Sequence, residues 1–254
     1  MKKQMEGEMK KQVARESEQE IPRELEEAGV FYEHKAFDVA LELVGAVLPG
    51  AVGETAVRAE TLHGDILTSL GRTDDALDAY AGALSRRPLH VPALIGAGAA
   101  RLLLKQWDAA ERQFEQVLSL EPANAKALLG CGLVARGRER FEEAQGWFLR
   151  AYREGGESAT ALRELLDVAS ALESFDLLLD VLRSRFETHP EELHVGFALA
   201  AVLHRTDRHE QAAAECRRIL ARNPDFRDVR DLLKSSLDAA WRVQDGALAA
   251  GVAC

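Results

Sequence analysis

Residues 70–88 read LGRTDDALDAYAGALSRRP, and two further stretches repeat their pattern at a fixed interval. LKQWDAAERQFEQVLSLEP occupies 104–122 and RERFEEAQGWFLRAYREGG occupies 138–156, so the three stretches begin at equal intervals. Turn residues recur with the same period, at Pro88, Pro122, Gly156, Pro190 and Pro224. A constant period of about 34 residues predicts an array of similar supersecondary units rather than a single globular core.

Each unit carries two apolar patterns with helical spacing, separated by a polar turn. Small residues recur in the first pattern and rings in the second, at Gly64, Gly98 and Gly132 and at Tyr80, Phe114 and Phe148. A small residue where two helices cross lets their axes approach, and the ring fills the space between hairpins. The turn GRTD (71–74) supplies a glycine that ends one helix and side chains that cap the next. The sequence therefore predicts helix, turn, helix and turn in every unit.

These marks resemble the tetratricopeptide repeat family, from Ile21 to Val243. The resemblance implies an all-α fold, a right-handed superhelical solenoid of about six helix-turn-helix repeats with a C-terminal capping helix. The expected divisions are a charged extension 1–20, repeats near 21–56, 57–90, 91–124, 125–158, 159–192 and 193–226, a capping helix 227–243 and a flexible tail 244–254. The repeat 159–192 has leucines where the small residues are expected, so we expect it to be packed more loosely or splayed.

Composition supports a helical protein and disfavours several functions. The net charge of −10 argues against a nucleic-acid binder, because phosphate recognition depends on clustered Lys and Arg. The three cysteines lack CxxC spacing, which disfavours a disulfide framework or a zinc ribbon. Residues 1–20 contain no apolar run, and no stretch has the roughly 20 apolar residues of a membrane span. We therefore expect a cytoplasmic protein that does not insert into membranes.

The inner side of the first helices contacts ligands in the family that this sequence resembles. The resemblance implies a peptide-binding groove formed by Ile95, Ala99, Leu102, Lys126, Leu129, Leu133, Arg136, Arg163, Phe197 and His204. Within it, an apolar strip consists of Ile95, Ala99, Leu102, Leu129 and Leu133. We expect this strip to receive an amphipathic helix or an extended apolar segment, with Lys126 and Arg136 meeting carboxylates of the partner. Alternatively, a neighbouring helix or the N-terminal extension covers the strip.

The sequence contains no recognisable catalytic machinery. It lacks GxxxxGK[ST], GxSxG and HExxH, and has no GxGxxG after a strand. The closest approach to a metal cluster is His189, His194, His204 and His209. No two of them are four residues apart, the spacing of ligands on one helix face. We therefore expect no enzyme activity, metal or cofactor, and we expect Cys131 and Cys216 to be small core residues.

The leading hypothesis is a scaffold or adaptor for protein–protein interaction, chaperone-like in holding a segment of its partner. One alternative is a self-assembling scaffold, in which the N-terminal segment of one copy enters the groove of the next. Another is the regulatory or chaperone arm of an enzyme or secretion complex, because the same fold supports many functions.

Overall fold

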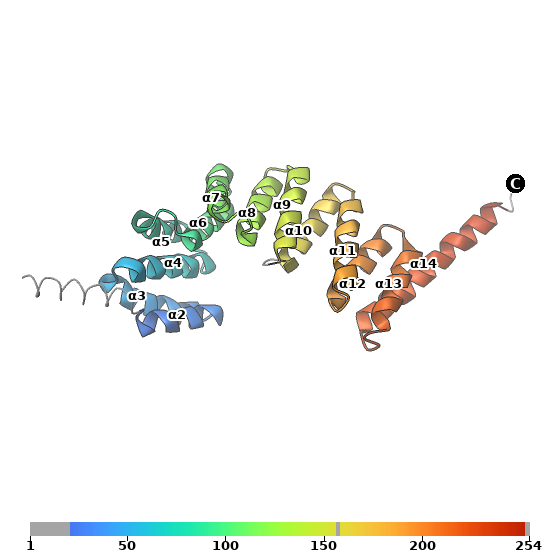
Figure 1. The fold of residues 1–254 in the computed structure, drawn as a ribbon, viewed down its shortest axis with the longest axis horizontal. Helices are drawn as coiled ribbons and strands as arrows, with labels where there is room; N and C mark the ends of the chain where they lie inside the picture. Colours follow the sequence, from blue (N-terminus) through green and yellow to red (C-terminus); the bar gives the residue numbers. More distant parts are fainter. Residues whose placement is uncertain (1–20, 156–157, 252–254) are drawn as a thin grey trace, which may run out of the picture. The chain divides into compact units, whose positions relative to one another are not determined.

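The computed structural model describes residues 21–155 and 158–251, and this part of the chain is helical and contains no strand (Figure 1). In chain order the helices are α2 (Arg23–Glu33), α3 (Phe37–Val47), the 3-10 helix η1 (Leu48–Gly50), α4 (Gly53–Ser69), α5 (Thr73–Arg86), α6 (Val91–Leu103), α7 (Trp107–Leu120), α8 (Ala125–Gly137), α9 (Phe141–Glu154), α10 (Ser158–Ala171), α11 (Asp176–Thr188), α12 (Leu193–Arg205), α13 (His209–Leu220) and α14 (Arg227–Gly251). The predicted all-α class of helix-turn-helix repeats is confirmed.

Two α-helices occupy each predicted repeat range, and α14 follows them. Helix α10 begins at Ser158, just ahead of the repeat 159–192, and two other boundaries differ by more from the sequence-based ranges. Helix α4 begins at Gly53, ahead of the repeat 57–90, and α14 continues to Gly251, beyond the expected end at Val243. The charged extension, residues 1–20, lies outside the described residues.

The chain divides into two compact units, Met1–Glu164 and Leu165–Cys254, and the boundary falls inside α10. In the first unit, α4 contacts α5 and α6, and α6 contacts α7 and α8. The first helices of successive repeats, α2, α4, α6 and α8, therefore touch one another in order and form what we call the first-helix face. In the second unit, α13 contacts both α12 and α14, and α14 also reaches α12.

Rings between the repeats of the first unit lie in sockets made by glycines. A Cβ atom added to Gly64 would lie 2.6 Å from the Tyr80 ring, and one added to Gly96 would lie 2.4 Å from it. Phe114 is held in the same way, because a Cβ at Gly130 would lie 2.5 Å from its ring. Both rings are buried. Each ring therefore needs one glycine from its own repeat and one from the next repeat along the chain.

The repeat 159–192 departs from this arrangement, and its second helix α11 has a buried side. Helix α11 buries Leu178 and Leu182 completely or almost completely, where the three preceding repeats have alanine and a ring. Its ring is Phe186, one turn further along the helix, and a Cβ at Gly196 of α12 would lie 2.5 Å from it. Larger aliphatic side chains thus fill the space on α11 and the ring lies further along that helix, while the expectation of looser packing or splaying of the whole repeat stays a prediction.

The turn inside each repeat contains one residue in the left-handed region. These residues are Lys35 (φ 60°), Gly71 (φ 76°), Lys105 (φ 57°), Glu139 (φ 61°), Glu173 (φ 51°) and Asp207 (φ 59°). From Gly71 onward they are evenly spaced along the chain, so the period of the sequence is also the period of the backbone. Glycine adopts this conformation without a steric penalty, but a side chain makes it costly. Five of the six turns therefore keep a strained backbone.

Replacing Lys105 with glycine is expected to raise the free energy of unfolding by about 0.5–1 kcal/mol. The strain at a left-handed residue is about 1–2 kcal/mol, and the extra flexibility that glycine gives the unfolded chain offsets part of the gain. The matched control is Gly71→Ala at the same position of the preceding turn, which should lose about 1 kcal/mol. Urea unfolding followed by circular dichroism measures both. Equal signs for the two changes would contradict the assignment of strain to these turns.

The predicted capping of the turn 71–74 is only partly confirmed. Gly71 is left-handed as expected, but the N-cap of α5 is Arg72, which makes no side-chain capping bond. Its guanidinium pairs instead with Asp75, at 2.7 Å between Nη2 and Oδ2. A side-chain cap is present at α8, where the Ala127 N–H donates to Asn124 Oδ1 at 3.0 Å.

Candidate functional site

The apolar strip lies on α6 and α8, which contact each other in the first unit. Ile95 and Leu102 stand on α6 with Ala99 between them in the chain, and they pack partly against the core below. Leu129 and Leu133 occupy the corresponding positions of α8. All five residues are partly exposed. The structure therefore brings the whole strip together on the first-helix face, half-buried rather than fully open.

A polar cluster lies on α4, next to the strip-bearing helix α6. The Tyr80 hydroxyl donates to Asp65 Oδ1 at 2.6 Å, and Thr68 Oγ1 lies 3.4 Å from the same hydroxyl. Burial raises the pKa of the Asp65 carboxyl above its ordinary value, while the bond from Tyr80 and the charge of Lys126 partly oppose that rise. Burial and the neighbouring Asp65 also raise the pKa of Tyr80. Tyr80 thus links the core of the repeat to the first-helix face.

Replacing Asp65 with asparagine is expected to stabilise the fold at pH 7 but not at pH 3. A carboxyl whose pKa is higher in the folded state binds its proton more tightly there, so stability falls as the pH rises from the unfolded pKa through the folded one. Asparagine can still accept a hydrogen bond from the Tyr80 hydroxyl, and it has no charge that burial would desolvate. Thermal unfolding at both pH values measures the difference. The control is Asp78→Asn at an exposed position of α5, and a pH-independent effect of Asp65→Asn would contradict the expectation.

The basic residues at the edge of the strip are joined by a buried carboxylate. Arg136 Nη1 lies 2.5 Å from Glu164 Oε2, and Arg163 Nη2 lies 3.3 Å from Glu164 Oε1. The Glu164 side chain is only 5% exposed, whereas Arg163 and Lys126 are exposed. A carboxylate of the chain itself therefore holds Arg136, the residue expected to meet partner carboxylates. The three joined side chains together keep a net charge of +1.

Glu164 is the residue of this site that sequence reasoning missed. It stands at the position of its repeat that Gly96 and Gly130 occupy in the two preceding repeats, where they contact the rings. A charged residue at a glycine position of a strict repeat was the signal that could have found it. A buried charge must be paired, so Glu164 is expected to have basic partners. Arg163, its neighbour in the chain, is one of them.

The two groove residues predicted in the second unit lie against its final helical segment. Phe197 of α12 packs on Phe226, which precedes α14, with ring centroids 5.7 Å apart. His204 Nδ1 lies 3.0 Å from the hydroxyl of Ser236 on α14, and Ser236 is fully buried. The structure therefore groups the predicted groove residues of α6, α8 and α10 in the first unit. It gives Phe197 and His204 contacts with the capping segment instead.

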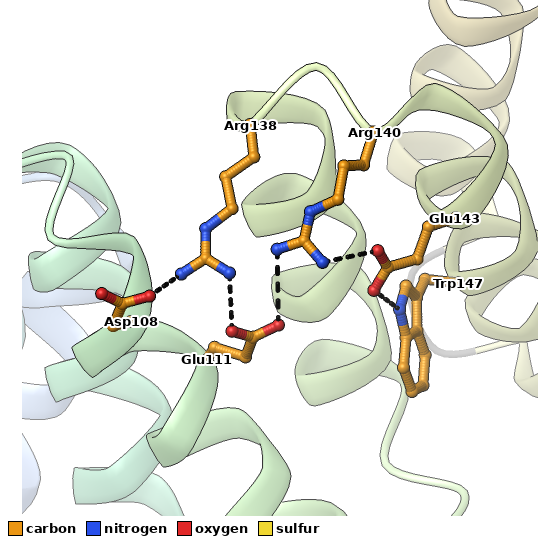
Figure 2. A network of polar contacts seen from close by, with 6 residues as sticks. All are labelled: Asp108, Glu111, Arg138, Arg140, Glu143 and Trp147. Atoms are coloured by element: carbon orange, nitrogen blue, oxygen red, sulfur yellow. Dashed lines mark hydrogen bonds and ion pairs between the residues drawn. The ribbon is translucent and has the colours of Figure 1, made fainter.

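A network of ion pairs ties the two strip-bearing repeats together. Figure 2 shows Arg138 reaching Asp108 and Glu111 of α7, while Arg140 reaches Glu111 and Glu143. The Arg138 Nη1–Glu111 Oε2 distance is 2.8 Å, and Arg138 is mostly shielded from solvent. Isolated surface pairs contribute little, but a connected network between two repeats fixes their geometry better. The turn between α8 and α9 is thereby anchored to α7.

A hollow of about 330 Å³ lies at the other end of the first-helix face, between α2 and α4. It is lined by Leu25, Glu26, Gly29, Val30, Glu33, Arg58 and Leu62. Its walls combine apolar groups with two carboxylates and one guanidinium. An apolar side chain flanked by a basic group fits such a lining.

Both cysteines of the described residues are buried, as predicted. Burial raises the pKa of the Cys131 thiol to about 12 and that of Cys216 to about 11. Neither thiol is therefore activated as a nucleophile. Across 21–155 and 158–251, no three His, Cys, Asp or Glu residues are grouped so that they could hold a metal ion. None of the described helices combines the length and the apolar character needed to span a bilayer.

Comparison with known proteins agrees with the repeat geometry. A sequence profile of the tetratricopeptide repeat matches residues 61–111 and 104–159. A search of curated proteins returns no match at a significant level. The chain is similar to the crystal structure of a tetratricopeptide repeat protein from Parabacteroides merdae, at 17% identity and a TM-score of 0.54, covering 84% of this chain and 83% of that one.

A second similar structure is a chain of the APC/C hetero-tetramer Cut9-Hcn1. The identity is 18% and the TM-score is 0.56, with 84% of this chain and 42% of that chain covered. At such identities the likeness concerns the fold alone. Residues 61–159 therefore match the tetratricopeptide repeat in sequence, and the evenly spaced helix pairs give the chain the fold of such repeat proteins.

Proposed function

We propose that this protein is a scaffold that captures an apolar helical or extended segment of another protein on its first-helix face. The observation that carries the proposal is the apolar strip, which lies partly exposed on two adjacent first helices. Charged and polar groups lie on either side of it, Asp65 on α4 and the Arg136–Glu164–Arg163 group beyond α8. A tetratricopeptide fold supports protein–protein interaction, and this face offers such an interaction an apolar surface.

Burial of the strip and of the partner side chains against it would contribute to binding. Burying about 400 Å² of apolar surface at ~25 cal/mol per Å² yields roughly 10 kcal/mol before the costs of association are subtracted. Ile95 and Leu102 already pack against the core, so these two side chains lose little conformational entropy when a partner binds. The partner is therefore expected to present aliphatic side chains at helical or alternating spacing.

The charges beside the strip indicate how the partner is oriented. Arg163 is exposed and shares Glu164 with Arg136, and Lys126 is also exposed. These cations favour a carboxylate on the partner near α8 and α10. The carboxylates of Glu26 and Glu33 line the hollow at α2 and favour a basic group there. We therefore expect a segment with an apolar centre, one basic end and one acidic end.

The test is a selection of helical peptides from a displayed library on the full chain, followed by calorimetric measurement of Kd. For a selected peptide, Leu129→Asp combined with Leu133→Asp is expected to weaken binding by at least about 100-fold, because both side chains would lie at the centre of the contact. The matched control is Val39→Asp combined with Leu120→Asp, on the second helices α3 and α7. Both control positions are exposed and aliphatic, so affinity should stay within about twofold of that of the original chain.

Circular dichroism establishes that both double variants are folded. Unchanged affinity in a folded Leu129/Leu133 variant would refute the proposed site. Equal losses in the test and control variants would show that added negative charge, and not the strip, governs binding.

A further inference from the structure

Helix α14 closes the second unit and has a buried side like any capping helix. Val229 and Ser236 are fully buried, and the Ser236 hydroxyl meets His204 of α12. The opposite side of a capping helix is expected to be polar, because no further repeat covers it. The outer side of α14 does not meet that expectation.

Two large apolar side chains stand on the outer side of α14. Leu237 is 42% exposed and Trp241 is 65% exposed, and Trp241 follows Leu237 by four positions, so they lie one above the other on the same side. The same stripe, followed at steps of three and four residues, contains Arg230 and Lys234 before them and Asp245 after them, all exposed. The stripe is therefore basic at its first end, apolar at its centre and acidic at its last end.

We propose that α14 pairs with α14 of a second copy of this chain, antiparallel and about a two-fold axis between Leu237 and Trp241. A two-fold contact requires a surface that is complementary to itself. In the antiparallel arrangement Leu237 of each copy lies opposite Trp241 of the other. Lys234 of each copy then falls within one residue of Asp245 of the other, because both pairs are almost symmetric about the same midpoint.

Charge decides between the two directions. A parallel pair would place Lys234 beside Lys234 and Asp245 beside Asp245, whereas the antiparallel pair matches opposite charges twice. Within the described residues, neither Lys234 nor Asp245 forms an ion pair in its own chain, while Arg230 lies 3.5 Å from Asp225. Both partners of the proposed intermolecular pair are thus available.

The contact is small, which fixes the expected strength. Stable protein interfaces bury about 1,200–2,000 Å² in total, and a single helix stripe buries less than that. We therefore expect a weak dimer that forms with rising concentration. The contact uses the second unit only, so it is independent of the apolar strip of the first.

Sedimentation equilibrium of the full chain, from about 1 to about 200 µM, tests the proposal over the range of weak association. The average mass should rise from the 27.9 kDa of the monomer toward that of a dimer. Leu237→Glu should weaken association at least about tenfold. The matched control is Leu120→Glu on α7, also 42% exposed, which should leave association unchanged.

Charge exchange gives a second readout that does not disturb the apolar centre. Lys234→Glu alone and Asp245→Lys alone should each weaken the dimer, because like charges then meet across the axis. The double exchange restores both pairs and should restore association. A monomer at every concentration, association insensitive to Leu237→Glu, or a failure of the double exchange to recover the dimer would overturn the proposal.

Discussion

Replacing Phe114 with alanine is expected to lower the free energy of unfolding by about 3–5 kcal/mol, the usual cost of emptying a buried phenylalanine site. The ring is buried between α6 and α8 and contacts the backbone at Gly130. Glycine has no side chain that could turn inward to fill the space, so the cavity should stay largely open. The loss should be close to the upper end of the range for this reason.

The measurement needs a probe of the first unit alone. The chain has three tryptophans, and with Trp241→Phe the remaining Trp107 and Trp147 both lie in the first unit. Urea unfolding followed by tryptophan fluorescence then reports on that unit. The control is Phe31→Ala on α2, where the ring is 38% exposed, and it should cost less than about 1 kcal/mol. Similar losses at both positions would show that Phe114 has no special role in joining repeats.

The second prediction concerns the socket rather than the ring. Gly130→Ala is expected to destabilise the first unit by about 1–3 kcal/mol, although alanine is the better helix former. A Cβ added at Gly130 would lie 2.5 Å from the Phe114 ring. The ring cannot move away, because it is also close to Gly98 of the same socket, where an added Cβ would lie 2.8 Å from it. Overpacking therefore outweighs helix propensity at this position.

Gly146 provides the matched control for that change. It also lies within a helix, α9, but nothing stands within 4 Å of a Cβ added there. Gly146→Ala should therefore stabilise the protein by up to about 1 kcal/mol. The same chemical change is thus expected to have opposite signs at two helical glycines. The same fluorescence-detected unfolding measures both, and equal signs would contradict the socket geometry.

The repeat period predicted most of the fold because it reflects local chemistry. Prolines and rings at fixed spacing report on single helices and their immediate neighbours, and the helix pairs follow them closely. The strip on α6 and α8 was predictable for the same reason, since adjacent first helices contact each other.

Other features depend on contacts that periodicity does not encode. In α11 the ring that packs between repeats is Phe186 and not a residue at position 182, one turn earlier. Its contact with Gly196 of the next repeat is not encoded in the periodicity. The covering of Phe197 and His204 depends on how α14 docks, and no repeat marks that docking. The burial of Glu164 depends on its pairing with Arg136, which is far from it in the chain, as well as with its neighbour Arg163.

The glycine sockets also bear on how the array can be lengthened. Helix α6 carries Gly96 for the ring of the preceding repeat and Gly98 for its own, and α8 carries Gly130 and Gly132 in the same way. A tandem copy of residues 91–124 would thus supply both glycines and the ring for each new contact between repeats. The repeats on either side have Leu62 or Glu164 at the first of these positions, so a tandem copy of either would lack that glycine.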